Sequence, residues 1–299
     1  MKAIILAGGI GSRLYPATGA LNKQLLPVYD KPMIYYPLAT LMQGGLRDVL
    51  IISGKEDIPR FRQILEDGQK IGMNISYAIE EKPEGIAKAL IIGENFIGKD
   101  SVCLALGDNL FYGSNLSRIL QRAAYLKEGA LVFAYWVNDP QRFGVVEFNR
   151  QGKVLSLEEK PKRPKSNYIV PGLYFYDNTV VDIVKQLKPS SRGEWEITDV
   201  NAEYLKQGRL RAEVLSRNIV WMDTGTPLSL LHAGNFVAFI EKRTGRKIAC
   251  IEEIAWRLGL ITPDKFQKLV FSLPKGPYRE YLLFLLEQDK QPFAEAEKL

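Results

Sequence analysis

The sequence predicts an α/β fold in which a parallel sheet is wrapped by helices and then extended by antiparallel strands. Up to residue 137, short β-rich segments alternate with amphipathic segments, which is typical of strands joined by helical crossovers. From residue 144, strand-like segments instead follow one another directly, separated only by turn residues. After residue 246 the pattern is helical. These observations indicate a mixed sheet with a helical appendage.

Five strands are expected in the first half, since each segment is short, rich in aliphatic residues and bounded by turn residues. They cover residues 2–8, 48–53, 75–80, 101–108 and 130–137. Several of the intervening helical segments end in glycine, as MIYYPLATLMQGG does, and glycine is a common helix stop.

The second half begins with GVVEFN, KVLSLEEKP and NYIVPGLYFYD, which we expect to form the antiparallel addition. A strand over residues 218–225 then leads into a helix at about 227–243. We therefore predict one domain over residues 1–245, with halves at about 1–140 and 141–245. The helical segment 246–299 would serve packing, oligomer contacts or regulation.

Composition excludes several classes of protein. The apolar fraction of 46% suits a globular core, and no apolar run approaches the roughly 18 residues that span a bilayer. The N-terminal MKAIILAGG is too short in its apolar run for a signal peptide. Two cysteines, Cys103 and Cys250, make neither a disulfide framework nor a metal cluster. We expect a cytoplasmic protein without membrane contact.

The net charge of +6 is modest, and no aromatic residues interleave with the basic ones. Nucleic acid is therefore not an expected partner. A small polyanion such as a nucleotide suits this charge equally well.

A glycine-rich loop, LAGGIGSRLYP at residues 6–16, follows the first strand directly. It does not match the dinucleotide fingerprint, because Leu14 stands where the third glycine belongs, and this argues against an NAD-dependent oxidoreductase. It does not match the P-loop either, because Arg13 replaces the second glycine. The loop still offers backbone N–H groups that could bind phosphate. The planar guanidinium of Arg13 and, later in the chain, the ammonium of Lys23 could bind phosphate oxygens as well. A tight turn with a solvated arginine is the alternative.

Two aspartates stand at strand ends, Asp108 in LGDNL and Asp223 in WMDTGT. Mg²⁺ in proteins is typically held by one or two carboxylates together with phosphate oxygens and water. From the residues alone, each aspartate could equally be a turn or capping residue.

The segment GGIGSRLYPATGALNKQLLPVYDKPMIYYPL resembles the N-terminal signature of the sugar nucleotidyltransferases, G-G-x-G-[ST]-R-L-x-P followed by K-Q-L-L-P-V. The likeness continues in order over nearly the whole chain, through LGDNLFYG, RFGVVEF, SLEEKPKRPKSNY, GLYFYD, RGEWEITDVN, WMDTGT and ACIEEIAWR. It implies a Rossmann-like wound mixed sheet. It also implies a direct displacement, in which a sugar 1-phosphate oxygen attacks the α-phosphorus of a nucleoside triphosphate and pyrophosphate leaves.

The likeness is greatest to family members that join dTTP to α-D-glucose 1-phosphate at the start of dTDP-rhamnose synthesis. No covalent intermediate is implied, and the only histidine, His232, lies in an expected helix, where we expect it to be a solvated or capping residue. The resemblance also implies a homotetramer and feedback by a nucleotide-sugar at a second site between subunits.

The resemblance assigns residues to four roles. The catalytic cations are Arg13 and Lys23 on the triphosphate and Lys160 on the sugar phosphate, and Mg²⁺ is held by Asp108 and Asp223. The nucleotide site comprises Leu6, Gly8, Gly9, Gly11, Ser12, Arg13, Lys23, Glu80, Gly85 and Asp108. The sugar-phosphate site comprises Asn109, Gly144, Glu159, Lys160, Val170 and Tyr174.

The chain departs from the family pattern at the base site, where Glu80 and Lys88 stand in place of expected glutamines. Glu80 could be protonated by burial and read thymine or uracil. It could instead pair with Lys82 or Lys88 and leave the Gly85 backbone to read the base, or the pocket could favour guanine. The remaining alternatives are UTP or another triphosphate, another hexose 1-phosphate, and a non-catalytic subunit that binds a nucleotide-sugar.

Overall fold

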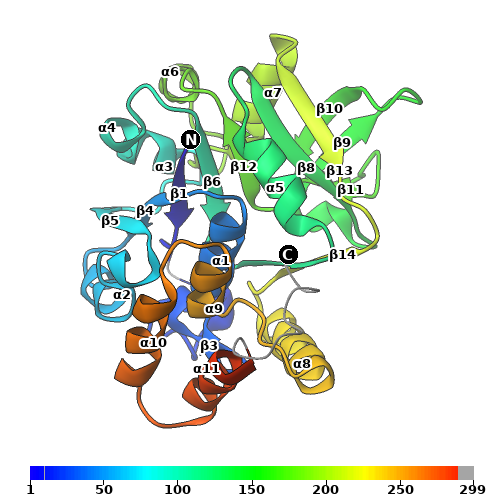
Figure 1. Cartoon of the computed structure of the whole chain (residues 1–299). Coiled ribbons are helices and arrows are strands. Elements are labelled where there is room, and N and C mark those ends of the chain that lie inside the picture. Colours follow the sequence, from blue (N-terminus) through cyan, green and yellow to red (C-terminus); the bar gives the residue numbers. More distant parts are fainter. Residues whose placement is uncertain (10, 289–299) are drawn as a thin grey trace.

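A ten-stranded mixed sheet runs through the molecule in a computed structural model that describes residues 1–9 and 11–288 (Figure 1). Its order along the main path is β10-β9-β11-β8-β12-β6-β1-β4-β5. The pairs β1–β4, β1–β6 and β4–β5 are parallel, as predicted. These four strands are β1 (Lys2–Leu6), β4 (Asp48–Ser53), β5 (Asn74–Ile79) and β6 (Val102–Leu106).

The antiparallel addition is also confirmed. Strand β12 lies between β6 and β8 and runs antiparallel to both, so the fifth expected strand, β8, is separated from the other parallel strands. Strand β13 then pairs with β8 in parallel, a strand that the sequence pattern did not indicate. The second-half strands are β8 (Ala130–Trp136), β9 (Gly144–Phe148), β10 (Val154–Glu159), β11 (Tyr168–Ile169), β12 (Leu173–Tyr176) and β13 (Leu210–Val214).

Two small sheets lie outside the main one. Strands β7 (Asn109–Gly113) and β14 (Ile219–Asp223) pair antiparallel, and β2 (Pro27–Val28) pairs with β3 (Lys31–Pro32). The expected strand at 218–225 is therefore confirmed as β14, but its partner is the unpredicted β7.

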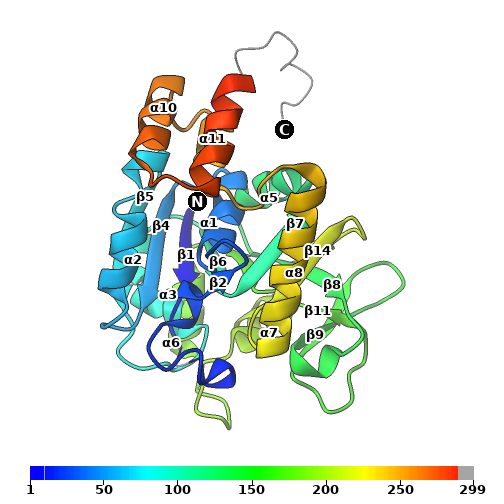
Figure 2. The same ribbon diagram turned by 90° about the horizontal axis from the view of Figure 1, so that it is seen from below.

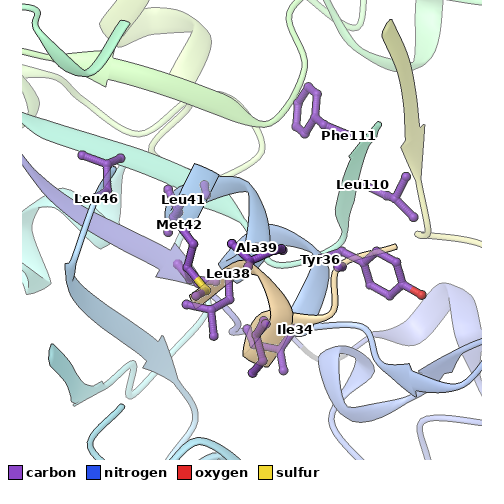
Figure 3. Packing of buried hydrophobic residues seen from close by; sticks show 14 of the residues in the cluster. Ile34, Tyr36, Leu38, Ala39, Leu41, Met42, Leu46, Leu110 and Phe111 are labelled. Atoms are coloured by element: carbon purple, nitrogen blue, oxygen red, sulfur yellow. The ribbon is translucent and has the colours of Figure 1, made fainter. Parts of the chain in front are cut away.

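Helices cover both faces of the main sheet. Successive side chains of a strand point to opposite faces, so apolar residues lie on both faces and form two cores. In β1, Ala3 and Ile5 pack with α1 and the C-terminal helices, whereas Ile4 packs with α3 and α6. Figure 3 shows part of the first core, with Leu38, Leu41 and Met42 of α1 and Leu110 and Phe111 of β7 among its members. The helices before the C-terminal segment are α1 (Tyr35–Gln43), α2 (Ile58–Leu65), α3 (Lys88–Ile92), α4 (Glu94–Ile97), α5 (Leu116–Ala124), α6 (Val180–Gln186), α7 (Ile197–Lys206) and α8 (Pro227–Thr244).

The C-terminal segment is helical, as predicted, and its first helix packs against α1 and the 3-10 turn Gln69–Ile71 (Figures 1 and 2). It contains α9 (Ile251–Arg257), α10 (Pro263–Ser272) and α11 (Pro277–Gln288). Trp256 of α9 stacks on Phe266 of α10 at a centroid distance of 4.7 Å. Residues 289–299 of the predicted segment lie outside the described residues. Across the part of the chain that the structure describes, no helix is long and apolar enough to cross a bilayer.

A buried ionic cluster joins the β2–β3 hairpin to the end of α8. Lys31 is 2% exposed and pairs with Asp30 and with Glu241, whose Oε1 lies 2.9 Å from the ammonium. Lys247 pairs with the same two carboxylates. Although burial alone would raise the pKa of Asp30, Lys247 and Lys31 hold it below its ordinary value.

We expect Glu241→Gln to lower the free energy of unfolding by about 2 kcal/mol, because the buried Lys31 loses a charged hydrogen-bond partner. Urea denaturation at pH 7 measures this loss. Glu213→Gln is the matched control, since it breaks an exposed ion pair with Arg122 and should cost less than about 1 kcal/mol. Equal losses in the two variants would contradict the role of the cluster.

Candidate active site

The glycine loop leaves β1 at the carboxyl edge of the parallel strands, where ligand crevices form in wound sheets. Gly9 and Gly11 have φ of 97° and 63°, in the left-handed region that favours glycine. At Gly8 the backbone approaches Glu80 closely: a methyl group there would lie 1.8 Å from Glu80 Oε2, so the Glu80 carboxyl would have to move. Ser12 begins a single 3-10 turn that ends at Leu14 and presents an exposed Arg13.

The buried side chain of Asn22 links this loop to neighbouring segments. Its amide donates to Ala7 O at 3.0 Å and to Asp57 Oδ2 at 2.9 Å, and its Oδ1 accepts from the Gln24 backbone at 2.8 Å. This buried asparagine therefore fixes the position of the turn that carries Lys23.

Gln24 is a site residue that the sequence reasoning missed. It is 2% exposed, its side chain lies against Gly107, and its Oε1 has no hydrogen-bond partner among the described residues. An unpaired buried amide oxygen costs free energy unless a ligand donates to it. The signal available in the sequence was its place beside Lys23 in the KQLLP segment.

The β7–β14 pair brings the two aspartates together. Asp223 ends β14 opposite Asn109, and the next residue, Thr224, donates its N–H and hydroxyl to Asp108 O at 3.0 and 2.8 Å. Because Asp108 immediately precedes Asn109, the two carboxylates lie at the same end of this small sheet. The predicted grouping is therefore present in the structure.

Asp108 is held as a carboxylate. Its Oδ2 pairs with the Lys23 ammonium and its Oδ1 accepts from Asn109 Nδ2 at 2.9 Å. Burial acts to raise the pKa of Asp108, but the charge and hydrogen bond of Lys23 outweigh it, and the pKa is lowered. Asp223 lies 3.6 Å from Arg142.

Arg13 reaches the same region from the glycine loop. A methyl group on Gly225 would lie 3.0 Å from Arg13 Nη2 and 3.3 Å from Asp223 Oδ2. Gly225 thus lets the guanidinium lie close to the backbone that follows β14. The loop, Lys23 and both aspartates converge on one place.

The expected sugar residues adjoin this place. Gly144 pairs with Glu159 across β9 and β10, and Val170 N donates to Gly144 O at 2.8 Å. Asn109 Oδ1 accepts from Gly172 N at 3.0 Å and from Trp221 Nε1 at 2.5 Å.

Tyr174 of β12 is buried close to two of these carboxylates. Burial raises the pKa of its phenol, and the charges of Glu159 and Asp108 raise it further. The phenol therefore stays neutral at physiological pH.

Thr198 and Arg192 are two further residues that the sequence reasoning missed. Thr198 Oγ1 donates to Glu159 Oε2 at 2.5 Å, and Arg192 lies 3.6 Å from Glu159 Oε1. Lys160 lies 3.4 Å from the same oxygen and is half-exposed. Glu159 is therefore an oriented acceptor with two neighbouring cations. The RGEWEIT segment, recognised only as part of the family pattern, supplies both missed residues.

The structure discriminates among the expectations for Glu80. Its pairing with Lys88 is wrong, because Lys88 pairs with Glu84 at 3.0 Å and lies 4.5 Å from the ring centroid of Trp195. Among residues 1–9 and 11–288, Lys82 makes no ion pair with Glu80 either. Burial raises the pKa of Glu80, and Glu84 adds to the effect. Both effects shift Glu80 toward its protonated form.

Gly85 adopts φ of 106°, and a methyl group there would lie 2.6 Å from the Trp195 backbone. His232 is exposed on α8, as expected. Cys103 is fully buried and Cys250 is 1% exposed.

A family profile described as "Nucleotidyl transferase" matches residues 2–239. The chain belongs to this family of enzymes. It is 54% identical over 288 residues to a glucose-1-phosphate thymidylyltransferase of Neisseria meningitidis, covering 96% of this chain and all of that protein.

Solved structures agree on the fold. A Bacillus anthracis protein crystallised with a sucrose is 45% identical, with a TM-score of 0.73 over 79% of this chain and 94% of that one. A UDP-glucose pyrophosphorylase complexed with UDP-glucose is 25% identical, with a TM-score of 0.69 over 81% of this chain and 99% of that one.

Proposed function

We propose that this enzyme transfers a thymidylyl group from dTTP to α-D-glucose 1-phosphate and releases pyrophosphate. The observation that carries the proposal is the convergence of the glycine loop, Arg13 and Lys23 on the pair Asp108 and Asp223. The relatives support the substrate pair, since the Neisseria protein, which is similar over nearly the full length of this chain, is named for it. Release of pyrophosphate from dTTP, dependent on both Mg²⁺ and glucose 1-phosphate, tests the proposal.

The two aspartates fit a divalent cation. Asp108 is held ionised, both side chains are largely buried, and carboxylate oxygens are the protein ligands that Mg²⁺ prefers. Bound there with the triphosphate, Mg²⁺ would neutralise charge on the phosphates.

The protein's own groups would position the reactants and balance their charges. Arg13 would bind the triphosphate oxygens with its planar fork, while the loop amides cradle them. Lys160 would hold the sugar phosphate, and Glu159 would accept hydroxyl groups of the hexose. No general base is required, because a phosphate monoester is already ionised near pH 7.

Base selection would depend on pH through Glu80. A protonated Glu80 can donate to a thymine carbonyl, whereas the carboxylate would meet that oxygen with a lone pair, a mismatch of about 1–3 kcal/mol. We expect the KM for dTTP to be lower at pH 6 than at pH 8, by up to about fivefold, because the raised pKa of Glu80 leaves more of it protonated at the lower pH. In Glu80→Gln the amide donates at every pH, so the corresponding change should be absent.

Steady-state kinetics on both proteins measures this difference, and the titration of the phosphates cancels because it affects both equally. Equal pH slopes would contradict the role of Glu80. Assays with UTP, GTP, ATP and CTP at the same two pH values address the other base choices. Strong preference for GTP would overturn the thymidylyl assignment while leaving the reaction class intact.

We further propose a homotetramer with a second nucleotide-sugar site, in a cytoplasmic enzyme. A cavity of about 820 Å³ lies between α1, α5, α8 and α9, apart from the glycine loop, and it is lined by Arg118 and by Lys247 and Arg257, which also pair with carboxylates of the protein. Such cations suit a diphosphate. Light scattering tests the tetramer. Inhibition by dTDP-rhamnose that is not competitive with dTTP tests the second site.

A further inference from the structure

Both candidate metal ligands already hold a cation of the protein itself. The Lys23 ammonium pairs with Asp108 Oδ2, and both side chains are less than one-fifth exposed. Arg142 lies 3.6 Å from Asp223, but it is shared with Asp139 at 2.9 Å. The ion pair between Lys23 and Asp108 is therefore the closer and the less shared of the two.

We propose that Lys23 occupies the place of the metal ion in the nucleotide-free protein and thereby excludes the metal until the triphosphate arrives. This inference rests on the proposed function, in which Asp108 and Asp223 are metal ligands. Lys23 then has two successive partners, first the Asp108 carboxylate and later the triphosphate oxygens.

Electrostatics gives the reason for exclusion. An ammonium in contact with Asp108 Oδ2 neutralises that carboxylate, so a divalent cation approaching it meets a positive charge at short range and in a poorly solvated place. The metal cannot bind this oxygen unless the ammonium leaves. Without another anion to receive it, the Lys23 ammonium would lose its partner and would lie close to the positive charge of the incoming metal ion, which is unfavourable.

The local structure allows Lys23 to move without disturbing the site. Its backbone is fixed by the 3-10 turn and by the anchored Asn22, whereas its ammonium is carried on a flexible four-carbon side chain. The Asp108 carboxylate is independently oriented by Asn109, which holds Oδ1. The side chain of Lys23 can thus turn to a phosphate while Asp108 stays in place.

Exchange of partners would couple the two ligands. A triphosphate compensates the ammonium and frees the carboxylate, so nucleotide strengthens metal binding, and by linkage metal strengthens nucleotide binding. A purely structural ion pair makes a different prediction, because its loss would not create affinity for a metal ion.

The test measures binding of Mn²⁺ alone to nucleotide-free protein, by the electron paramagnetic resonance signal of the free ion. We expect Lys23→Met to bind Mn²⁺ about tenfold more tightly than the wild type. Lys23→Arg keeps the charge and should stay near the wild type. Adding Asp108→Asn to Lys23→Met should abolish the gain. Unchanged or weaker Mn²⁺ binding by Lys23→Met would overturn the proposal.

Lys185→Met is the matched control, because Lys185 pairs with Glu94 on the surface and its loss should leave Mn²⁺ binding unchanged. If Lys23→Met does not fold by circular dichroism, Lys23→Gln provides a neutral, more polar replacement with the same expected gain. Product formation by the wild type is measured separately. A wild type that makes dTDP-glucose beside a Lys23→Met without the gain would reject only this inference. A wild type without transferase activity would reject the proposed function.

Discussion

Asp108→Asn should lower kcat by about 100-fold or more while leaving the fold intact. The amide has nearly the same shape, and the contacts of Thr224 are to the backbone oxygen of residue 108, so β7 and β14 remain joined. The variant loses the negative charge that would hold the metal ion and that now pairs with Lys23. Pyrophosphate release at saturating substrates measures the effect.

The stability of Asp108→Asn provides an internal check. Because the pKa of Asp108 is lowered in the folded protein, its ionised form contributes stability above the ordinary carboxyl pKa near 4. This contribution is lost as the pH falls through the lowered pKa. The variant should therefore be somewhat less stable than the wild type at pH 7, and the two should converge in acid.

Asp100→Asn is a suitable comparison, since Asp100 forms only a more exposed ion pair with Lys2 and turnover should be unchanged. A folded Asp108→Asn enzyme with near-normal turnover would remove Asp108 from the metal site.

Arg13→Ala should also lower kcat by about 100-fold or more, because Arg13 is the cation that the glycine loop presents toward the aspartate pair. Its side chain is exposed, so the free energy of unfolding should change by less than about 0.5 kcal/mol. Turnover and urea denaturation of the same preparation separate the two effects.

Arg13→Lys keeps one positive charge but loses the planar fork, so it should recover only part of the activity. Arg122→Ala is the matched surface control, since Arg122 is exposed on α5 and pairs with Glu213 of β13 rather than with a site residue. If Arg13→Ala retained normal kcat, the glycine loop would have to bind phosphate through its amides alone.

Much of the fold was predictable because its strands carry local signals. The parallel strands β1, β4 and β6 are short aliphatic runs that are largely buried on both faces, and their alternation with helices is visible along the chain. Strand β5 lies at the edge of the sheet and is only partly buried. Strands β7 and β13 were missed. Strand β7 follows the β6 segment after only two residues, and β13 carries charged residues and is only partly buried. For both, pairing partners rather than composition decide the conformation.

The site was predictable to the extent that motifs carry it. Asp108, Asp223 and the glycine loop were found from strand ends and glycine spacing, and the resemblance supplied the sugar residues. Gln24, Thr198 and Arg192 were missed, because their roles come from neighbours distant in sequence.

The sequence by itself determined the wound α/β class, the glycine loop and the charges available to it, because these depend on residue types at fixed local spacings. Only the tertiary structure decided that β7 and β14 align the two aspartates, that Lys23 pairs with one of them, and that Glu80 is buried while Lys88 pairs with Glu84. The physical reason is that ion pairing and burial depend on which distant segments meet. A carboxylate's charge state and partner are properties of the assembled site.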